Sequence, residues 1–261
     1  MAFIYESKGK AKEYNPIALN IYRGCDHGCS YCYAPSVLRM KKDEFMNSAP
    51  RKDVVEGVRK EAHKWTGQEI LLCFTTDPYQ KIAESTGITR QVVRILVDAG
   101  VIPVILSKGG MRATADFDIL KECITPAKFG TTLTFDNDKD SLEWEPNAAT
   151  PLERIESLRL AKEAGLSTWV SCEPVIDPQQ TLNLIKLSAP YVDMFKVGRW
   201  NHDARANAID WKKFGTEVVD LLEKLGVNYY IKKDLAKYLD DFENTTKIPG
   251  QKAKQENGKL F

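Results

Sequence analysis

The stretch TPLERIESLRLAKEAGLSTWVSC, residues 150–172, contains a helix and a strand in succession, together with the signals that separate them. Thr150 is a good capping residue, and Pro151 suits the first helical position, where its missing N–H is not needed. Apolar residues then recur three and four apart up to Gly165, which favours a helix end. The run at 167–172 is rich in strand-forming residues. This stretch therefore predicts one unit of an alternating helix and strand pattern.

The same alternation extends in both directions along the chain. Further strand-like apolar runs are IALNIY (17–22), ILLCFT (70–75), VIPVILS (101–107), FGTTLTF (129–135) and YVDMFKV (191–197). Segments with helical periodicity lie between or after them, at 53–65, 89–100, 114–123, 177–189 and 208–226. The run VNYYIK at 227–232 could add a seventh strand. Because such units wind parallel strands right-handedly, we predict an α/β fold, a partial (β/α)6 TIM-like barrel.

Length and composition agree with one large domain. The chain has 261 residues, which we divide into an N-terminal extension (1–16), the barrel (17–240) and a polar C-terminal tail (241–261). Lys and Arg total 37 against 36 acidic residues, so the net charge indicates neither nucleic acid nor membrane as a partner. No apolar run approaches the ~20 residues that cross a bilayer, and the first residues lack the apolar core of a signal peptide. We expect a cytoplasmic protein.

Three of the six cysteines, Cys25, Cys29 and Cys32, cluster in RGCDHGCSYCYAP, which follows the first predicted strand. The glycines and the proline of this segment disfavour a helix and predict a loop on which three thiolates can converge. Such a set favours an iron–sulfur cluster, in which three ligands leave one iron open. Two alternatives are a zinc site completed by His27 and a metal-free group of buried thiols.

This C-x₃-C-x₂-C pattern, with Tyr31 before its last cysteine, resembles the radical S-adenosylmethionine (SAM) superfamily. The segments TTDPYQ, ILSKGG, EPNAATPLERIESLRLAKEAG and FKVGRWN resemble the subgroup of spore photoproduct lyase and the DNA-repair photolyase-like proteins. The resemblance, over roughly residues 15–235, implies a 4Fe-4S cluster and SAM as cofactors. It also implies an electron donor such as flavodoxin or ferredoxin, and a 5′-deoxyadenosyl radical that abstracts hydrogen from an unidentified substrate.

Polar side chains at the carboxyl ends of the predicted strands would bind the cofactor, because barrel enzymes place their chemistry there. The resemblance implies that Tyr31 contacts the adenosyl group, that Thr76 lies near SAM, and that Arg154 lies near the cofactor or its supporting residues. Lys108 suits the cofactor carboxylate. The full set of candidates is Tyr31, Tyr33, Thr76, Asp77, Lys108, Thr132, Thr134, Arg154 and Lys196. Each also has a structural alternative, as a packed aromatic, a turn residue, an interior filler, a solvated lysine or an ion-paired arginine.

The segment SCEP offers two candidate catalytic groups, Cys172 and Glu173. A thiol beside a radical site can donate a hydrogen atom, and a glutamate can hold a substrate or move a proton. A packing role is the alternative for Cys172. Phe74 separates Cys73 from the TTD segment, whereas in spore photoproduct lyase the hydrogen-donating cysteine directly precedes the matching segment. Because a one-residue shift turns a strand side chain to the other face, we expect Cys73 to point away from the radical.

A second hypothesis assigns the chain to another class, that of zinc-containing binding proteins. In it the cysteines hold zinc for structural purposes, and the chain is a binding protein. Its partner would be nucleic acid, recognised through local Lys and Arg patches and through exposed aromatic residues such as Trp200.

Overall fold

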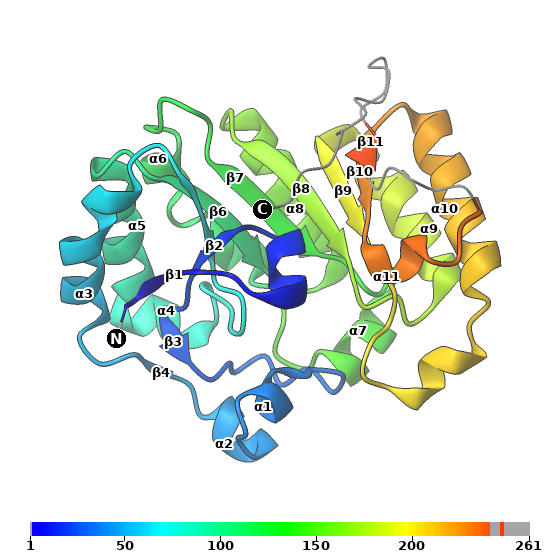
Figure 1. Cartoon of the computed structure of the whole chain (residues 1–261), viewed down its shortest axis with the longest axis horizontal. Coiled ribbons are helices and arrows are strands. Elements are labelled where there is room, and N and C mark those ends of the chain that lie inside the picture. Colours follow the sequence, from blue (N-terminus) through cyan, green and yellow to red (C-terminus); the bar gives the residue numbers. More distant parts are fainter. Residues whose placement is uncertain (1, 241–245, 248–261) are drawn as a thin grey trace, which may run out of the picture.

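The computed structural model describes residues 2–240 and 246–247, and it confirms the α/β fold (Figure 1). Within this part of the chain, nine strands form one sheet in the order β1-β2-β5-β6-β7-β8-β9-β10-β11. Their bounds are β1 Ile4–Glu6, β2 Ile17–Leu19, β5 Glu69–Leu72, β6 Ile102–Ser107, β7 Lys128–Thr132, β8 Ser167–Cys172, β9 Met194–Val197, β10 Asn228–Ile231 and β11 Thr246–Lys247. A separate antiparallel pair consists of β3 Tyr22–Arg23 and β4 Ala49–Pro50.

All six predicted strands are present, and the tentative seventh strand is β10. From β2 to β10 each neighbouring pair in the sheet is parallel. The edge strands β1 and β11 are antiparallel to β2 and β10. In the described part of the chain the two edges do not pair with each other, so the sheet is a partial barrel. β1 falls within the predicted extension 1–16. Most of the predicted tail 241–261 lies outside the described residues.

Helices follow most strands and cover the outer face of the sheet (Figure 1). They are α1 Ala34–Val37, α2 Lys42–Met46, α3 Val54–Glu61, α4 Lys81–Thr86, α5 Ile88–Asp98, α6 Phe117–Leu120, α7 Asp138–Trp144, α8 Pro151–Glu163, α9 Pro178–Ser188, α10 Trp211–Leu225 and α11 Lys233–Ala236. The 3₁₀ helices are η1 Gly9–Glu13, η2 Ala62–Trp65, η3 Gly110–Thr114, η4 Ala189–Tyr191 and η5 Ala204–Ala208. In the described residues, no helix has the length and apolar character that crossing a membrane requires.

The helix predicted from residues 150–172 forms as expected. Thr150 accepts the N–H of Glu153, and the Glu153 carboxylate accepts the N–H of Thr150, so both ends of a capping box are present. Pro151 is the first helical residue. Gly165 follows the helix with φ of +81°, a left-handed conformation that glycine adopts without a steric penalty.

Strand alternation sorts the side chains of β7 and β8 between two layers. Phe129 packs with the helices in the main core, whereas Trp169 belongs to a smaller apolar cluster on the inner face. A Cβ on Gly130 would lie 2.5 Å from the Trp169 ring, so only glycine leaves room for this indole. The inner cluster fills the barrel interior below the strand ends. Polar residues therefore gather at the carboxyl ends of the strands, as predicted.

Candidate active site

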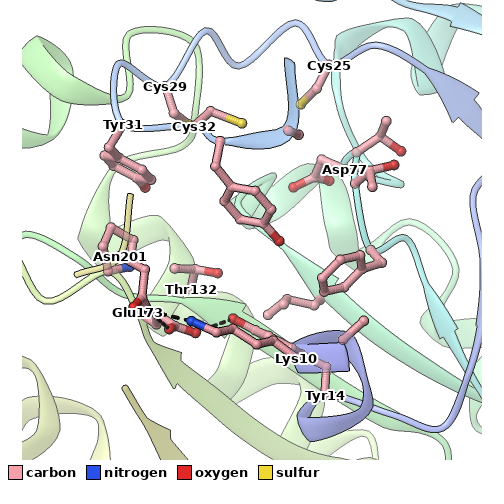
Figure 2. A pocket seen from close by; sticks show the side chains of 18 of the residues that line it. Lys10, Tyr14, Cys25, Cys29, Tyr31, Cys32, Asp77, Thr132, Glu173 and Asn201 are labelled. Carbon is pink, nitrogen blue, oxygen red and sulfur yellow. Dashed lines mark hydrogen bonds between the residues drawn. The ribbon is translucent and has the colours of Figure 1, made fainter. Parts of the chain in front are cut away.

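A cavity of about 340 Å³ opens at the carboxyl ends of the parallel strands (Figure 2). Ten of the fourteen residues proposed from the sequence line it. They are Cys25, Cys29, Tyr31, Cys32, Tyr33, Thr76, Asp77, Lys108, Thr132 and Glu173. These side chains come from the cysteine loop and from the ends of β5, β6, β7 and β8. One cavity therefore collects groups that are up to 148 positions apart in the sequence, from residue 25 to residue 173.

The cysteine loop, residues 24–32, is held tightly against α2. Gly24 has φ of +84°, and a Cβ there would lie 2.4 Å from the Phe45 carbonyl oxygen. That same oxygen accepts the Cys25 N–H at 2.8 Å. Glycine is thus required for close approach of the two backbones. All three thiols are free, and in Figure 2 they lie along one side of the cavity.

The donor set on this loop fits an iron–sulfur cluster. In the part of the chain that the structure covers, no three His, Cys, Asp or Glu side chains lie at the spacing of a single metal ion's ligands. In a cluster each thiolate binds a different iron. Burial raises the pKa of the Cys29 thiol to about 12, and the nearby Lys108 opposes that rise. Cluster iron would add positive charge that favours the thiolate.

His27 contacts Asp77 and Asn147, and it is not directed toward the three thiols as a fourth zinc ligand would be. Its Nε2 lies 3.0 Å from Asp77 Oδ2, at ion-pair distance but without ideal hydrogen-bond geometry, and its Nδ1 lies 3.2 Å from the Asn147 carbonyl oxygen. The His27 residue is 2% exposed. Because both ring nitrogens face oxygen atoms, the imidazole ties the cysteine loop to its neighbours and is not directed at the three thiols.

Asp77 is saturated by protein donors. Its carboxylate accepts the Tyr79 N–H and the Ser107 hydroxyl at 2.7 Å each, and the Lys108 N–H at 2.6 Å. Burial by itself would raise its pKa, but the adjacent His27 and these hydrogen bonds lower it to about 2. Asp77 therefore organises the cavity wall. These contacts fit the alternative role of Asp77 as a turn residue better than a contact with the SAM ammonium.

Tyr31 is oriented by a buried ion pair. Its hydroxyl donates to Glu145, and Glu145 Oε2 lies 2.5 Å from Arg154 Nη2. The Thr134 hydroxyl is 3.4 Å from the Tyr31 hydroxyl. Burial would raise the pKa of Glu145, but Arg154 and then Lys108 lower it. Thr134 and Arg154 do not line the cavity. Thr134 lies beside the lining residue Tyr31, whereas Arg154 pairs with Glu145 and donates to the carbonyl oxygen of the lining residue Thr132. The expected position of Arg154 near the cofactor or its supporting residues stays a prediction.

The cavity wall that faces the cysteine loop is a polar cluster around Glu173 (Figure 2). The Tyr14 hydroxyl donates to Glu173 at 2.7 Å, Asn201 Nδ2 donates at 3.0 Å, and Lys232 Nζ is in direct contact. Lys232 Nζ also lies 3.5 Å from the centroid of the Tyr14 ring. We call these four residues the Glu173 cluster. Sequence reasoning identified only Glu173. Asn201 ends the quoted segment FKVGRWN but was given no role, and Tyr14 and Lys232 lie far from Glu173 in the chain.

The structure corrects three expected positions. Cys172 does not line the cavity, because Thr132 pairs with Ser171 in register and the next side chain turns toward the helices. Lys196 binds the carbonyl oxygens of Glu13 and Tyr14 and so anchors the N-terminal segment. Cys73 was expected to face away; it is 2% exposed and packs in the main core, although it also borders the cavity. Its sulfur accepts the N–H of Ile21 at 3.4 Å.

Comparisons with known proteins identify the family of this chain. The family model of the radical SAM superfamily matches residues 19–186. An uncharacterised protein of Acidianus two-tailed virus is 26% identical over 69% of this chain and 63% of its own length. An uncharacterised protein of Mycobacterium tuberculosis is 26% identical over 62% of this chain and 50% of its length. The chain thus spans between half and two thirds of these relatives.

Two solved structures share the fold. Spore photoproduct lyase complexed with dinucleoside spore photoproduct has a TM-score of 0.63 at 12% identity, covering 87% of this chain and 78% of that one. SuiB of Streptococcus suis bound to S-adenosylmethionine has a TM-score of 0.58 at 16% identity, covering 85% of this chain and 52% of that one. The fold and the site define a partial-barrel enzyme with a cysteine loop at its mouth. The chain belongs to the radical SAM superfamily.

Proposed function

We propose that the chain holds a 4Fe-4S cluster through Cys25, Cys29 and Cys32 and reductively cleaves S-adenosylmethionine, so that hydrogen is abstracted from a substrate still to be identified. The observation that carries the proposal is the shared cavity: the three cysteines and six of the nine side chains expected to face the cofactor line the same space. A cluster bound there would supply the electron that splits SAM into methionine and a 5′-deoxyadenosyl radical.

The chain's own residues would bind and orient the cofactor. Lys108 Nζ lies 5.5 Å from the centroid of the Tyr31 ring and 3.9 Å from Glu145 Oε1, so its cation stands at the cavity wall beside the cysteine loop. It would attract the SAM carboxylate. The Thr76 hydroxyl lines the cavity close to the Cys73 thiol, and it would accept from the SAM ammonium. Tyr31, fixed by Glu145, would pack against the adenosyl group.

We assign the Glu173 cluster to the substrate side of the cavity. It faces the cysteine loop across the open space, and it joins donors and acceptors from four separate segments of the chain. A substrate held by the Glu173 cluster would face the 5′-deoxyadenosyl radical formed near the cysteine loop. The two uncharacterised relatives name no substrate, so the choice among nucleic-acid lesions, nucleosides, peptides and small metabolites needs experiment.

Anaerobic reconstitution tests the metal assignment. We expect a brown protein with iron and sulfide near ~4 each per chain, because one three-cysteine loop holds one cubane. A colourless protein that binds one zinc would refute the assignment, and iron well above ~4 per chain would refute the single cluster. A Cys29→Ala variant treated in the same way is the control for iron bound outside the loop.

A further inference from the structure

Trp200 carries a buried hydrogen-bond donor on the wall of the cavity. The sequence suggested an exposed aromatic residue, but Trp200 is 4% exposed and lines the cavity. Its indole Nε1 has no acceptor among the described residues. By contrast, Trp169 Nε1 donates to the Ile105 carbonyl oxygen at 3.0 Å. Trp211 Nε1 donates to the Ala206 carbonyl oxygen at 2.9 Å. Because a buried donor without a partner is costly, a ligand in the cavity is the natural source of the missing acceptor.

The segment after β9 places Trp200 between the two sides of the cavity. The next residue, Asn201, donates to Glu173 at 3.0 Å and so belongs to the Glu173 cluster (Figure 2). The Trp200 ring packs edge-on against Trp144, with 5.8 Å between the ring centroids. The Trp144 ring in turn lies 6.5 Å from that of Tyr31 on the cysteine loop. Trp200 therefore connects the substrate side of the cavity with the side expected to hold the cofactor.

Glu173 keeps an acceptor position on the same wall. Its Oε2 accepts the Tyr14 hydroxyl and contacts Lys232, whereas among the described residues Oε1 accepts only from Asn201. A carboxylate oxygen can accept two hydrogen bonds. A Cβ on Gly198 would lie 2.8 Å from Oε1, so the backbone packs closely against this oxygen and fixes its position. A substrate that brings a donor to Oε1 and an acceptor to the indole N–H would complete both groups.

The charged groups of the cavity wall away from the cysteine loop balance one another. In the described part of the chain three cations and three carboxylates line it, namely Lys8, Lys10, Lys232, Glu13, Glu173 and Asp234. Lys10 contacts Asp234, and Lys232 contacts Glu173. With His202 neutral the formal charges cancel, so this wall offers no net attraction to an anion or to a cation. An uncharged polar group therefore fits it better than a carboxylate, a phosphate or an ammonium group.

We propose that Trp200 and Glu173 select a substrate that carries an amide group, with the Trp200 N–H donating to the amide carbonyl oxygen and Glu173 accepting the amide N–H. The inference deepens the proposed function and rests on it. An amide is uncharged, and it provides the acceptor and the donor that the two residues lack. A site built in this way rejects analogues that leave its buried polar groups unpaired. Open-chain amides and the ring amides of lactams share this chemistry, and two probes distinguish them.

The test follows the indole N–H signals of reconstituted protein labelled with ¹⁵N-tryptophan. The Trp200 signal is identified by its loss in Trp200→Phe, and the bonded N–H groups of Trp169 and Trp211 serve as internal references. The amide probes are N-methylacetamide, which is open-chain, and pyrrolidinone, which is a ring amide. The comparison probes are acetate, inorganic phosphate, isopropanol and SAM alone. Saturation transfer to each probe gives its dissociation constant for wild type, Trp200→Phe and the control Trp65→Phe, which lies outside the cavity.

We expect at least one amide probe to move the Trp200 signal to lower field, as a new hydrogen bond does, while the signals of Trp169 and Trp211 stay in place. Trp200→Phe should bind that probe roughly threefold or more weakly, because one hydrogen bond between uncharged groups is lost, whereas Trp65→Phe should match the wild type. The amide that binds more tightly shows whether the substrate group is open-chain or part of a ring.

Three results would overturn the assignment of Trp200. They are an unmoved Trp200 signal with both amides, an equal shift with acetate, phosphate or isopropanol, and a shift with SAM alone, which would assign the N–H to the cofactor. Equal amide affinity of Trp200→Phe and Trp65→Phe would also overturn it. If the amide results hold but a loaded and reduced protein never cleaves SAM, the proposed function fails and the amide site stands.

Discussion

Replacing Arg154 by methionine should destabilise the protein strongly, because it leaves the Glu145 carboxylate buried without its partner. The two side chains are at most 1% exposed and meet at 2.5 Å. Arg154 Nε also donates to the Ala149 carbonyl at 2.9 Å, and Nη1 donates to the Thr132 carbonyl at 3.1 Å. Methionine approximates the volume of the stem but provides none of these donors.

The expected loss of stability in Arg154→Met follows from the burial of this ion pair. Removing one partner of a buried ion pair costs about 3–5 kcal/mol. Lys108, at 3.9 Å from Glu145, can compensate only in part. We expect the free energy of unfolding to fall by about 4 kcal/mol, which lowers the melting temperature by roughly 8–16 °C in a chain of this size. The measurement is urea unfolding of the metal-free protein, followed by circular dichroism.

Two matched variants separate the buried charge from other effects. Arg159→Met lies on the same helix, and Arg159 pairs with Glu156 and Glu163 near the surface, so it should cost less than ~1 kcal/mol. The double variant Glu145→Gln with Arg154→Met removes the unpaired charge and should be more stable than Arg154→Met alone. If Arg154→Met costs no more than Arg159→Met, our reasoning about this ion pair is wrong.

Three further predictions concern the cysteine loop, the cofactor cation and an ion pair outside the cavity. Cys29→Ala should abolish cluster retention while Cys73→Ala keeps it, measured as iron and sulfide after reconstitution; full colour in Cys29→Ala would contradict the ligand assignment. Lys108→Ala should weaken SAM binding tenfold or more, because a charge-assisted contact contributes roughly 1.5–3 kcal/mol, and unchanged affinity in a fully loaded protein would exclude that contact. Burial would raise the pKa of Asp193, but hydrogen bonds from Lys162 and the Thr168 N–H lower it. Its stabilisation is therefore present above the ordinary carboxyl pKa and is lost as pH falls through the lower folded value, so the stability gap between wild type and Asp193→Asn should close on acidification; a gap independent of pH would refute this.

The framework could be predicted because its signals are local. Strand runs, helical periodicity and the cap at Thr150 all act within a few residues, and they predicted six parallel strands and a seventh. Thr132, expected at the carboxyl end of its strand, lies at the cavity, whereas Phe129 packs with the helices. The cysteine loop was predictable because its ligands are close together in the sequence.

The rest of the site depends on contacts that no local pattern encodes. Tyr14 reaches Glu173 across 159 positions, and Asn201 reaches it across 28. The direction of Cys172 depends on the register between β7 and β8, which pairs Thr132 with Ser171 and which sequence alone does not give. From the sequence alone, His27 was a candidate zinc ligand. The fold places Asp77 against its ring, a contact between residues 50 positions apart that no local pattern predicts.

The most direct test of the proposed function is chromatography of 5′-deoxyadenosine after anaerobic incubation of reconstituted protein with SAM and dithionite. We predict slow formation even without substrate, since an uncoupled radical is quenched by any nearby hydrogen donor, and no formation by Cys29→Ala. A fully loaded and reduced protein that yields no 5′-deoxyadenosine above the no-enzyme control, with candidate substrates present as well as absent, would contradict the claim that this cavity carries radical SAM chemistry.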